Sequence, residues 1–539
     1  MNKEKCNPEK IWKQYQQGVN YNNSIHLYDT VKRNENFYLG RQWEGLKAPD
    51  LEKPVFNFID RVVTYFIAML VSDDIGVDIK SFKQDSVSEI ADKALSTEVL
   101  RVIERTKAKA VNREAVRDAA VDGDCFAYFR FDADVETGQL ARGEIAMELI
   151  NNTDVIFGNP YDEDVQEQPY IIIAQRKQTK VLQREAKAAG VKEWEQIVPD
   201  NSSLDYMPHG VSASDLTTVL IKLYKDSKSG TVHYTKSTQT IVLQEDTDLD
   251  YRLYPIARMG WKRVKNSYHA QAAITDGVVQ NQIYVNKMWA LFMIQTVRGT
   301  FPTTFYDKSK IKSWDNRAGA AIGVQGAPDA SVVMDYKPAD FSQQAVDIVQ
   351  RTIDYTKEFM GATDVALGNI KPENTSAIIA TQKASAAPLE LQRLAFYQFV
   401  EDYVRVIIDI IRSDYGLREV AFNEPISVDE MGNALRSSII DFSALNTDAM
   451  ELNIEVGSAS YWSELTQIQT ADNLFSRGII TDAQLYLDSI PDKYIRNKQK
   501  IIDNIEQMQQ MQAMQAQAMP QGAGNPLGAQ VAQMTPQIL

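Results

Sequence analysis

The chain has 539 residues and a mass of 60.8 kDa, enough for about three or four packing units and a sizeable hydrophobic core. Hydrophobic residues make up 44% of the chain and charged residues 24%, which excludes a wholly disordered, collagen-like or disulfide-scaffold protein. The 57 lysine and arginine residues against 72 aspartate and glutamate residues give a formal charge of −15, the wrong sign for holding nucleic acid through the overall field.

Cysteine content and hydropathy predict a reduced, intracellular and soluble protein. The only cysteines are Cys6 and Cys125. Residues 1–17 are polar and charged, with no apolar core of signal-peptide length. The most apolar stretch, 55–71, contains an Asp-Arg pair and falls short of the roughly 20 apolar residues that a membrane span needs. We therefore expect no membrane partner.

The first half of the chain alternates helical and strand patterns. Residues 55–71 predict an amphipathic helix, because the apolar residues recur on one helix face at Ile59, Val62, Val63, Phe66, Ile67 and Leu70. A second helical run is expected over 86–120, and Gly123 ends it. Strand patterns separated by turn-like residues follow at 125–131, 145–149, 170–177, 219–223, 232–234 and 241–243. The predicted fold class is α+β.

Two long helices are expected to flank one insert. Residues 268–298 predict one helix of 31 residues, roughly 45 Å long at 1.5 Å per residue. Its polar residues are mostly amides, which suits packing among neighbouring helices better than free solvation. Residues 299–340 lose helical periodicity and contain several glycines and prolines. Helix resumes over 341–360 with a sustained apolar seam.

The last third is predicted to be mainly helical. Residues 374–376 (Asn-Thr-Ser) are natural N-caps for another long helix, and Pro388 within that run predicts a kink. A short strand is expected at 451–456, followed by C-terminal helices. No charged residue occurs from Gln507 onward, so we expect a helix that frays into a disordered end from Pro520.

No convincing catalytic or metal site is visible in the sequence. The histidines stand far apart and pair with no cysteine or carboxylate at metal-ligand spacing, so each is expected to be an ordinary surface or strand residue: His26, His209, His233 and His269. No phosphate-binding glycine loop or nucleophile elbow occurs. We therefore expect a protein that is not an enzyme, without catalytic residues, cofactor or metal.

Two acidic groups leave an enzymatic alternative open. One runs from Glu245 to Asp250 and the other from Asp162 to Asp164, and each could bind a divalent ion. By default both are solvated loop faces. The alternative is a metal-dependent nuclease or other phosphoryl-transfer enzyme, which metal-stimulated activity abolished at Asp246 or Asp248 would support.

Basic residues concentrate in the insert between the two long helices, where they interleave with aromatic residues: Lys308, Lys310, Lys312 and Arg317 with Tyr306 and Trp314. We call these six residues the clip patch. They are the best candidate for docking an acidic partner or DNA phosphates. The alternative is an exposed strand or helix with alternating, solvated lysines.

The order of these elements resembles that of the portal protein of tailed double-stranded DNA bacteriophages. Three segments carry the resemblance: FYLGRQW (37–43), KPVFNFIDRVVTYFIAML (53–70) and DYTKEFMGATDVALGNIKPENTSAIIATQKASAAPLELQ (354–392). The likeness covers nearly the whole chain. Its specificity rests on the combination and order of elements, because no single motif is sharp.

The resemblance implies a portal fold that assembles into a ring of about twelve subunits around a DNA channel. The segments implied are an N-terminal part of the wing (1–265), a first stem helix (266–298), a clip (299–340), an antiparallel second stem helix (341–360), a tunnel loop (361–376), a kinked helix with the C-terminal part of the wing (377–460), crown helices (461–519) and a disordered tail (520–539).

The resemblance also implies a function and partners. The ring would occupy one capsid vertex, nucleate head assembly, conduct the genome during packaging and ejection, and dock the terminase large subunit and then the head–tail adaptor through the clip patch. Major capsid and scaffolding proteins would be further partners. Assembly would take place in the cytoplasm of the bacterial host, and the mature location would be the portal vertex of the virion. Another ring-forming virion component, an adaptor or tail protein, is the second alternative.

A packaging channel must hold DNA without gripping it, because each strong phosphate contact becomes a barrier to movement. Acidic walls serve that need, and no sequence-specific contact is expected. In the implied tunnel loop, Lys371 and the nearby Lys383 would centre the duplex; alternatively they pair locally with Asp364 or Glu373. The full set of channel candidates is Asp364, Asn369, Lys371, Glu373, Asn374 and Lys383.

Overall fold

The computed structural model belongs to the α+β class, as predicted. The chain forms two compact units, Met1–Val456 and Gly457–Leu539. The residues that the structure describes are 7–48, 51–71, 75–81, 86–139, 141–200, 215–301, 303–315, 322–327, 329, 332–336, 343–362, 387–422, 427–428, 434–435, 437–445, 450–456, 461–479, 486–487, 490, 495, 498 and 501–502.

Three helices open the first unit: α1 (Pro8–Ser24), α2 (Leu27–Tyr38) and α3 (Phe58–Leu70). Helix α3 confirms the apolar pattern found in the sequence, because Ile59, Val62 and Phe66 are all buried in the main core. Its N-terminus is capped by Asn57, whose side chain accepts a hydrogen bond from the backbone of Asp60.

The expected helical run over 86–120 is two helices, α4 (Ser86–Arg105) and α5 (Ala108–Asp122). The prediction of one run is wrong because Lys107 takes a left-handed backbone conformation (φ 55°), which ends one helix and starts the next. The predicted stop at Gly123 is confirmed; its φ of 106° suits glycine best.

Two antiparallel sheets form the body of this unit. The first has the order β3-β2-β9, from β2 (Asp124–Asp132), β3 (Glu144–Asn151) and β9 (Ile256–Gly260). The second has the order β4-β5-β6-β7-β8, from β4 (Val155–Phe157), β5 (Ile171–Gln178), β6 (Leu216–Lys225), β7 (Val232–Ser237) and β8 (Val242–Asp248). These strands confirm the strand predictions for 125–243.

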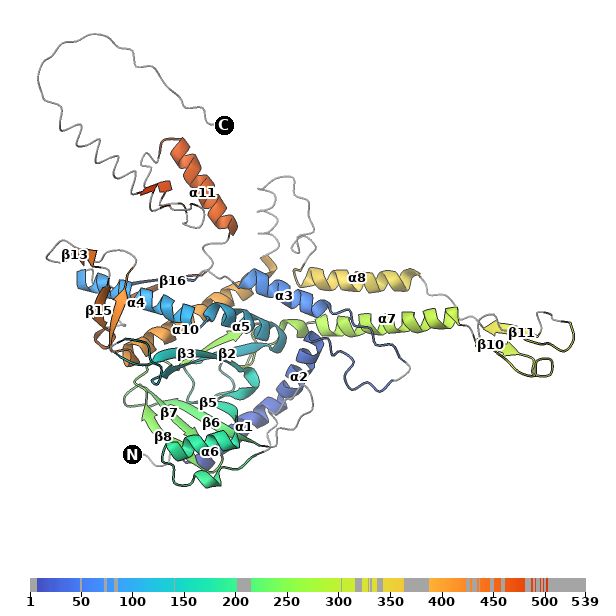
Figure 1. Ribbon diagram of the computed structural model, residues 1–539, viewed down its shortest axis with the longest axis horizontal. Coiled ribbons are helices and arrows are strands. Elements are labelled where there is room, and N and C mark those ends of the chain that lie inside the picture. The colour runs from blue at the N-terminus through green and yellow to red at the C-terminus, as the bar shows by residue number, and fades with distance from the viewer. Residues whose placement is uncertain are drawn as a thin grey trace, which may run out of the picture. The chain divides into compact units, whose positions relative to one another are not determined.

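Helices cover the sheets. Helix α1 lies on the five-stranded sheet, where Ile11 and Tyr15 pack with Ile156, Ile172 and Leu220 (Figure 1). Helix α6 (Thr179–Ala188) packs through Leu182 and Ala186 against Val219, whose position next to Leu220 places it on the opposite face.

Helix α10 (Glu390–Asp414) lies over β9 and β2 and buries a continuous apolar face. It starts after a 3-10 turn, Ala387–Leu389, so among the described residues Pro388 precedes the helix rather than kinking it. Near its end the buried carboxylate of Asp409 accepts hydrogen bonds from the backbone N–H groups of Arg252 (2.7 Å) and Leu253 (2.9 Å). This contact fixes α10 to the segment before β9.

Three further strand pairs complete the first unit: β1 (Ile75–Ser81) with β16 (Met450–Val456), β12 (Leu417–Ala421) with β15 (Ser437–Asp441), and β13 (Ser427–Val428) with β14 (Ala434–Leu435). Strand β16 confirms the strand expected at 451–456. In the second unit, α11 (Tyr461–Ser476) is described, and Phe475 near its end stacks on Tyr486 with ring centroids 4.5 Å apart.

The two long helices are α7 (Val278–Thr300) and α8 (Gln343–Phe359). Helix α7 has 23 residues, so the expected start at Tyr268 is wrong. Gly277 (φ 83°) cannot continue a right-handed helix, and the preceding residues form only a single 3-10 turn, Ala273–Thr275. Before that turn, Ala270 donates its N–H to Asp124 of β2, and Gln271 pairs with Lys262. No helix of the described residues is both long and apolar enough to cross a membrane.

Candidate functional surface: the two long helices and their hairpin

The N-terminal half of α7 is held inside the chain by amides. The Nε2 group of Gln282 donates to the carbonyl of Phe56 (2.9 Å), and its Oε1 accepts from the N–H of Phe58 (3.2 Å). Asn286 donates to Oε1 of Gln42 (2.5 Å). Both α7 amides are buried. The amide side chains of α7 therefore serve packing, as predicted. Gln282 and Asn286 pack against the segment of the same chain that runs from the end of α2 to the start of α3.

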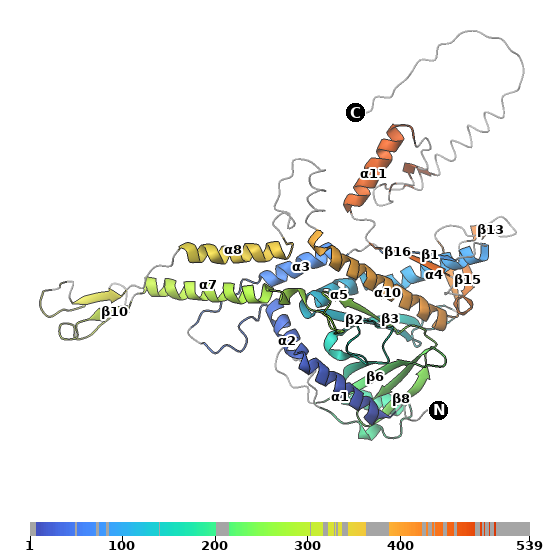
Figure 2. The same cartoon turned by 180° about the vertical axis from the view of Figure 1, so that it is seen from behind.

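Helix α7 also pairs with α8. Both views show the two helices side by side (Figures 1 and 2). Asn281, in the first turn of α7, donates from Nδ2 to Oγ1 of Thr356, in the last turn of α8 (2.7 Å), so the helices are antiparallel. Val349 and Thr356 are buried between them, each with 2% of its surface exposed. Beyond Ala290, no residue of α7 is buried.

Large apolar side chains are exposed along this pair and the hairpin that joins it. Of 29 such side chains among the described residues, twelve lie between 284 and 359: Tyr284, Leu291, Val297, Phe301, Phe305, Tyr306, Met334, Tyr336, Val346, Ile348, Tyr355 and Phe359. We call this set the apolar pair surface. Exposed apolar side chains concentrated on one set of elements are typical of a surface that contacts another protein.

The apolar pair surface is ordered in stripes. Tyr284 and Leu291 are seven residues apart on α7, and Ile348 and Tyr355 are seven apart on α8. Seven residues make about two helical turns, so each pair lies on one face of its helix. Each helix thus offers a seam of the kind that a neighbouring helix packs against.

Between the helices the insert forms a small hairpin. Strands β10 (Thr303–Tyr306) and β11 (Val333–Tyr336) pair antiparallel, with Thr304 opposite Asp335, and the Thr304 hydroxyl donates to Asp335 (2.7 Å). Ile311 and Val332 are almost fully buried and form its minimal core. The loss of helical periodicity over 299–340 was predicted, whereas this strand pairing was not.

The clip patch lies on this hairpin. Lys308 and Lys312 are exposed, Lys310 and Trp314 are half-buried, and Arg317 is outside the described residues. None of the three lysines forms a salt bridge with another described residue. Tyr306 stacks on Trp314 with ring centroids 5.3 Å apart.

A turn at Asp307 presents these lysines. Its carboxylate accepts hydrogen bonds from the Ser309 hydroxyl (2.6 Å) and backbone N–H (2.9 Å), and these bonds lower the pKa of Asp307. The structured turn, the stacked aromatic pair and the lysines, which form no salt bridge with another described residue, together make a surface able to receive a partner's carboxylates or phosphates.

The predicted channel residues lie outside the described residues: Asp364, Asn369, Lys371, Glu373, Asn374 and Lys383. The assignment of a tunnel loop at 361–376 therefore stays a prediction. Only Gly361 and Ala362 of that segment are described, directly after α8.

Acidic residues from both groups that could bind a divalent ion have protein partners instead. Asp246 accepts a hydrogen bond from the Tyr224 hydroxyl (2.7 Å) and faces Nδ1 of His233 (3.2 Å). Glu163 pairs with Arg263 (2.6 Å) and Arg258 (3.5 Å) beside a cleft of about 650 Å³ between β9 and α10. Within the described part of the chain, no three histidine, cysteine or acidic side chains are grouped as a metal ion requires.

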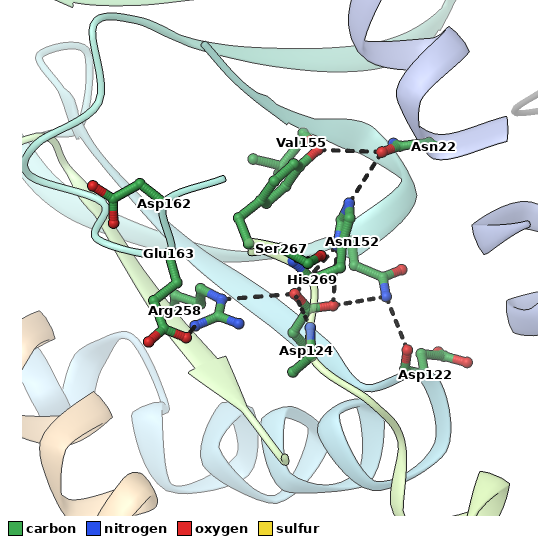
Figure 3. A network of polar contacts seen from close by, with 12 residues as sticks. Asn22, Asp122, Asp124, Asn152, Val155, Asp162, Glu163, Arg258, Ser267 and His269 are labelled. Atoms are coloured by element: carbon green, nitrogen blue, oxygen red, sulfur yellow. Dashed lines mark hydrogen bonds and ion pairs between the residues drawn. The ribbon is translucent and has the colours of Figure 1, made fainter. Parts of the chain in front are cut away.

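One histidine was misjudged from the sequence. His269, expected to be an ordinary surface or strand residue, is 3% exposed and belongs to a buried polar network with Asp124 and Asn22 (Figure 3). Nothing in the sequence marks this network, because its three residues lie more than 100 positions apart in every pairing. Only the tertiary fold brings them together.

No protein-family model matches this chain, and no curated protein shows a significant match to it.

Proposed function

We propose that this chain is a portal protein of a tailed double-stranded DNA bacteriophage, forming a ring of about twelve subunits at one vertex of the capsid. The observation that carries the proposal is the antiparallel pair α7–α8, joined by a hairpin and bearing the apolar pair surface. In a ring, the pair of each subunit contacts the pairs of both neighbours and removes this surface from water.

The seams on the two helices fit such a ring. A closed ring is built from head-to-tail contacts, in which two different surfaces of each subunit meet. The stripe on α7 containing Leu291 and the stripe on α8 containing Ile348 supply two such surfaces, with side chains 50% and 51% exposed. An α7 seam of one subunit would therefore pack on the α8 seam of the next.

The hairpin is the proposed docking site for the packaging and tail machinery. The hairpin follows the C-terminal end of α7 and precedes the N-terminal end of α8. The lysines of its clip patch form no salt bridge with another described residue. Terminase large subunit and later the head–tail adaptor are the proposed partners at this surface. Major capsid and scaffolding proteins are proposed partners of the ring elsewhere.

The charge of the chain fits a passage for DNA. Twelve copies of a chain with net charge −15 carry a formal −180, a field that disfavours tight binding of a polyanion. Lys371 and Lys383 are proposed to centre the duplex in the channel. The proposed protein is thus a conduit without an active site, driven by an external ATPase and located at the portal vertex of the virion.

Two alternatives make different predictions. An adaptor or tail protein would also form a ring, but it would join finished heads and would not be needed for DNA to enter them. A metal-dependent nuclease would cleave DNA, and replacing Asp246 or Asp248 would abolish the cleavage. We favour the portal because neither alternative accounts for the long antiparallel pair with its hairpin.

Gene deletion with complementation tests the proposal. Without this chain, the phage should make no DNA-filled heads, and supplying the full-length chain in trans should restore them. Complementation with Lys371→Ala should alter DNA packaging or retention while rings still form. DNA-filled heads in the absence of the chain would contradict the proposal.

A further inference from the structure

Helix α7 carries positive charges and no negative charge. Its charged residues are Lys287 and Arg298, both with exposed side chains. Lys287 lies three residues after Tyr284 and four before Leu291, so the three side chains share one face of the helix. Lys287 forms no salt bridge with another described residue. The exposed stripe on α7 is therefore both apolar and positively charged.

The exposed stripe on α8 has carboxylates beside its apolar residues. Asp347 directly precedes Ile348 and Asp354 directly precedes Tyr355, so the same acidic and apolar pair recurs after seven residues, or about two turns. Both carboxylates are exposed. Each accepts a hydrogen bond from the glutamine four residues earlier (3.3 and 3.0 Å), and neither forms a salt bridge with another described residue. The stripe on α8 therefore offers negative charge to a partner.

The remaining charges of α8 leave this side of the helix negative. Glu358 lies four residues after Asp354 and adds a third exposed carboxylate. Of the two cations in α8, Arg351 follows Asp347 by four residues and lies on the same side. Lys357 directly precedes Glu358 and so lies on another side. Three carboxylates against one guanidinium leave the stripe with a formal charge of −2.

The hydrogen bond between Asn281 and Thr356 (2.7 Å) shows which residues of the two helices lie at the same height. Because the helices are antiparallel, each residue further along α7 corresponds to one residue further back along α8. Leu291 lies ten residues after Asn281 and is therefore level with position 346, ten residues before Thr356. Ile348 is two residues from that level, about 3 Å at 1.5 Å per residue. These apolar residues of the two stripes thus lie at nearly the same height.

Lys287 lies at the height of the two aspartates. It is six residues after Asn281 and is therefore level with Gln350 by the same count. Asp347 lies three residues to one side of that level and Asp354 four to the other, about 4.5 Å and about 6 Å along the helix. A lysine has a flexible four-carbon side chain, so its ammonium group reaches either level.

A ring carries these heights from one subunit to the next. In the proposed ring the subunits are related by rotation about a common axis. A rotation does not move an atom along its axis. With the axis parallel to the helical pairs, the height of each residue is therefore the same in every subunit. The α7 stripe of one subunit meets the neighbour's α8 stripe with Leu291 near Ile348, and with Lys287 between the two aspartates.

We propose that Lys287 of each subunit pairs with Asp347 and Asp354 of the next subunit, and that these ion pairs set the register in which α7 packs on the neighbour's α8. The partner is a second copy of this chain, and the proposal rests on the proposed ring. Charge complementarity selects this contact. Packing α7 on α7 brings cations together and packing α8 on α8 brings carboxylates together, whereas packing α7 on α8 brings together opposite charges. The contact is head-to-tail, as a closed ring requires.

Charge reversal in two separate full-length chains tests the proposal. One chain carries Lys287→Glu, which places a carboxylate against the neighbour's aspartates. The other carries Asp347→Lys with Asp354→Lys, which places lysines against the neighbour's Lys287. Like charges in a contact oppose association strongly, so each chain alone should form at least about tenfold fewer rings than the wild type. Size-exclusion chromatography with light scattering measures the ring fraction.

Mixing the two chains decides whether the ion pair joins neighbours. In an equimolar mixture, alternating chains bring every α7 stripe against an α8 stripe of opposite charge, so rings should return. A pair within one subunit would stay repelled in both chains, and mixing would restore nothing. A single chain with all three substitutions should also form rings. Lys192→Glu, at an exposed lysine outside the helical pair, is the matched control and should assemble as the wild type does.

The outcomes separate this proposal from the proposed function. A wild-type ring fraction in either chain alone, or a mixture without rings, would overturn the proposed pairing and leave the proposed portal ring standing. A wild-type protein that forms no ring would contradict both. Circular dichroism of each variant should match the wild type, because the reversed residues are exposed and form no salt bridge with another described residue.

Discussion

Asn281 and Thr356 lie 75 residues apart in the chain, yet a hydrogen bond of 2.7 Å between their side chains joins the first turn of α7 to the last turn of α8. Thr356 is 2% exposed, so the bond is shielded from water on that side. The contact sets the antiparallel register of the two helices, and with it the positions of the exposed stripes that the proposed ring would bury.

Removing the Thr356 hydroxyl should loosen this pair. We expect Thr356→Val to lower the free energy of unfolding by about 1 kcal/mol, because Asn281 loses its acceptor and valine cannot replace it. Denaturant unfolding followed by circular dichroism measures the change.

Thr352→Val is the matched control for that variant. The Thr352 hydroxyl donates to the carbonyl of Ile348 in its own helix (2.8 Å) and makes no bond to α7. Its loss should change stability less than Thr356→Val does. Equal effects of the two variants would show that the bond between the helices contributes nothing of its own.

Charges placed on the apolar pair surface should block assembly without unfolding the subunit. We expect Leu291→Asp with Ile348→Asp to convert rings into monomers, since each buried Leu or Ile side chain contributes about 1.5–3 kcal/mol. Size-exclusion chromatography with light scattering separates a ring of about 730 kDa from the 60.8 kDa chain.

Val198→Asp controls for the introduced charge. Val198 is 60% exposed and lies between α6 and β6, outside the helical pair. This variant should keep the wild-type particle size. Rings that survive in the double variant with unchanged size would place the subunit contacts somewhere other than on α7 and α8.

Replacing Lys308, Lys310 and Lys312 by serine should weaken binding of terminase or the adaptor while leaving the hairpin folded. None of the three forms a salt bridge with a described residue, so serine removes no such bridge from the described part of the hairpin. Pull-down with the cognate terminase large subunit and with the adaptor measures the effect. Its control is serine at three exposed lysines elsewhere, Lys109, Lys192 and Lys228, which changes the net charge equally. Similar losses in both triple variants would indicate a general charge effect.

Asp154 should make stability depend on pH. Burial raises its pKa from the ordinary 3.8 to about 6 in the folded chain. The folded state therefore binds more protons than the unfolded state between these values, and stability falls as the pH rises from about 4 to about 6. Asp154→Asn should remove this fall and gain up to about 3 kcal/mol at pH 7.

Urea unfolding at pH 4 and pH 7 checks the Asp154 prediction. Asparagine keeps an oxygen to accept from Thr153, whose hydroxyl lies 3.2 Å from Oδ1 of Asp154. Asp134→Asn, at an exposed turn residue, is the control and should leave the pH profile as in the wild type. A pH dependence that survives in Asp154→Asn would assign it to another group.

Local patterns predicted the elements whose shape follows from nearby residues. The seam containing Val62, Val63 and Phe66 predicted α3, and Gly123 correctly predicted a helix end. The α+β class followed from the change in hydrophobic period near Cys125. Such features depend on side-chain spacing within a few turns, and the sequence displays that spacing directly.

Features set by long-range contacts could not be predicted. Residues 268–277 have a helical composition. However, the N–H of Ala270 donates a hydrogen bond to the Asp124 carboxylate, and Gly277 has a positive φ that a right-handed helix does not allow. Helix α7 therefore starts later than expected. The pairing of Thr304 with Asp335 crosses 30 intervening residues without any periodic signal. The burial of His269 likewise depends on partners in α1 and β2.

Electron microscopy of the purified full-length protein tests the central claim most directly. The account predicts rings of about twelve subunits around an open central hole, with the helical pairs packed against one another around the ring. Monomers, dimers or closed particles without a hole would contradict it.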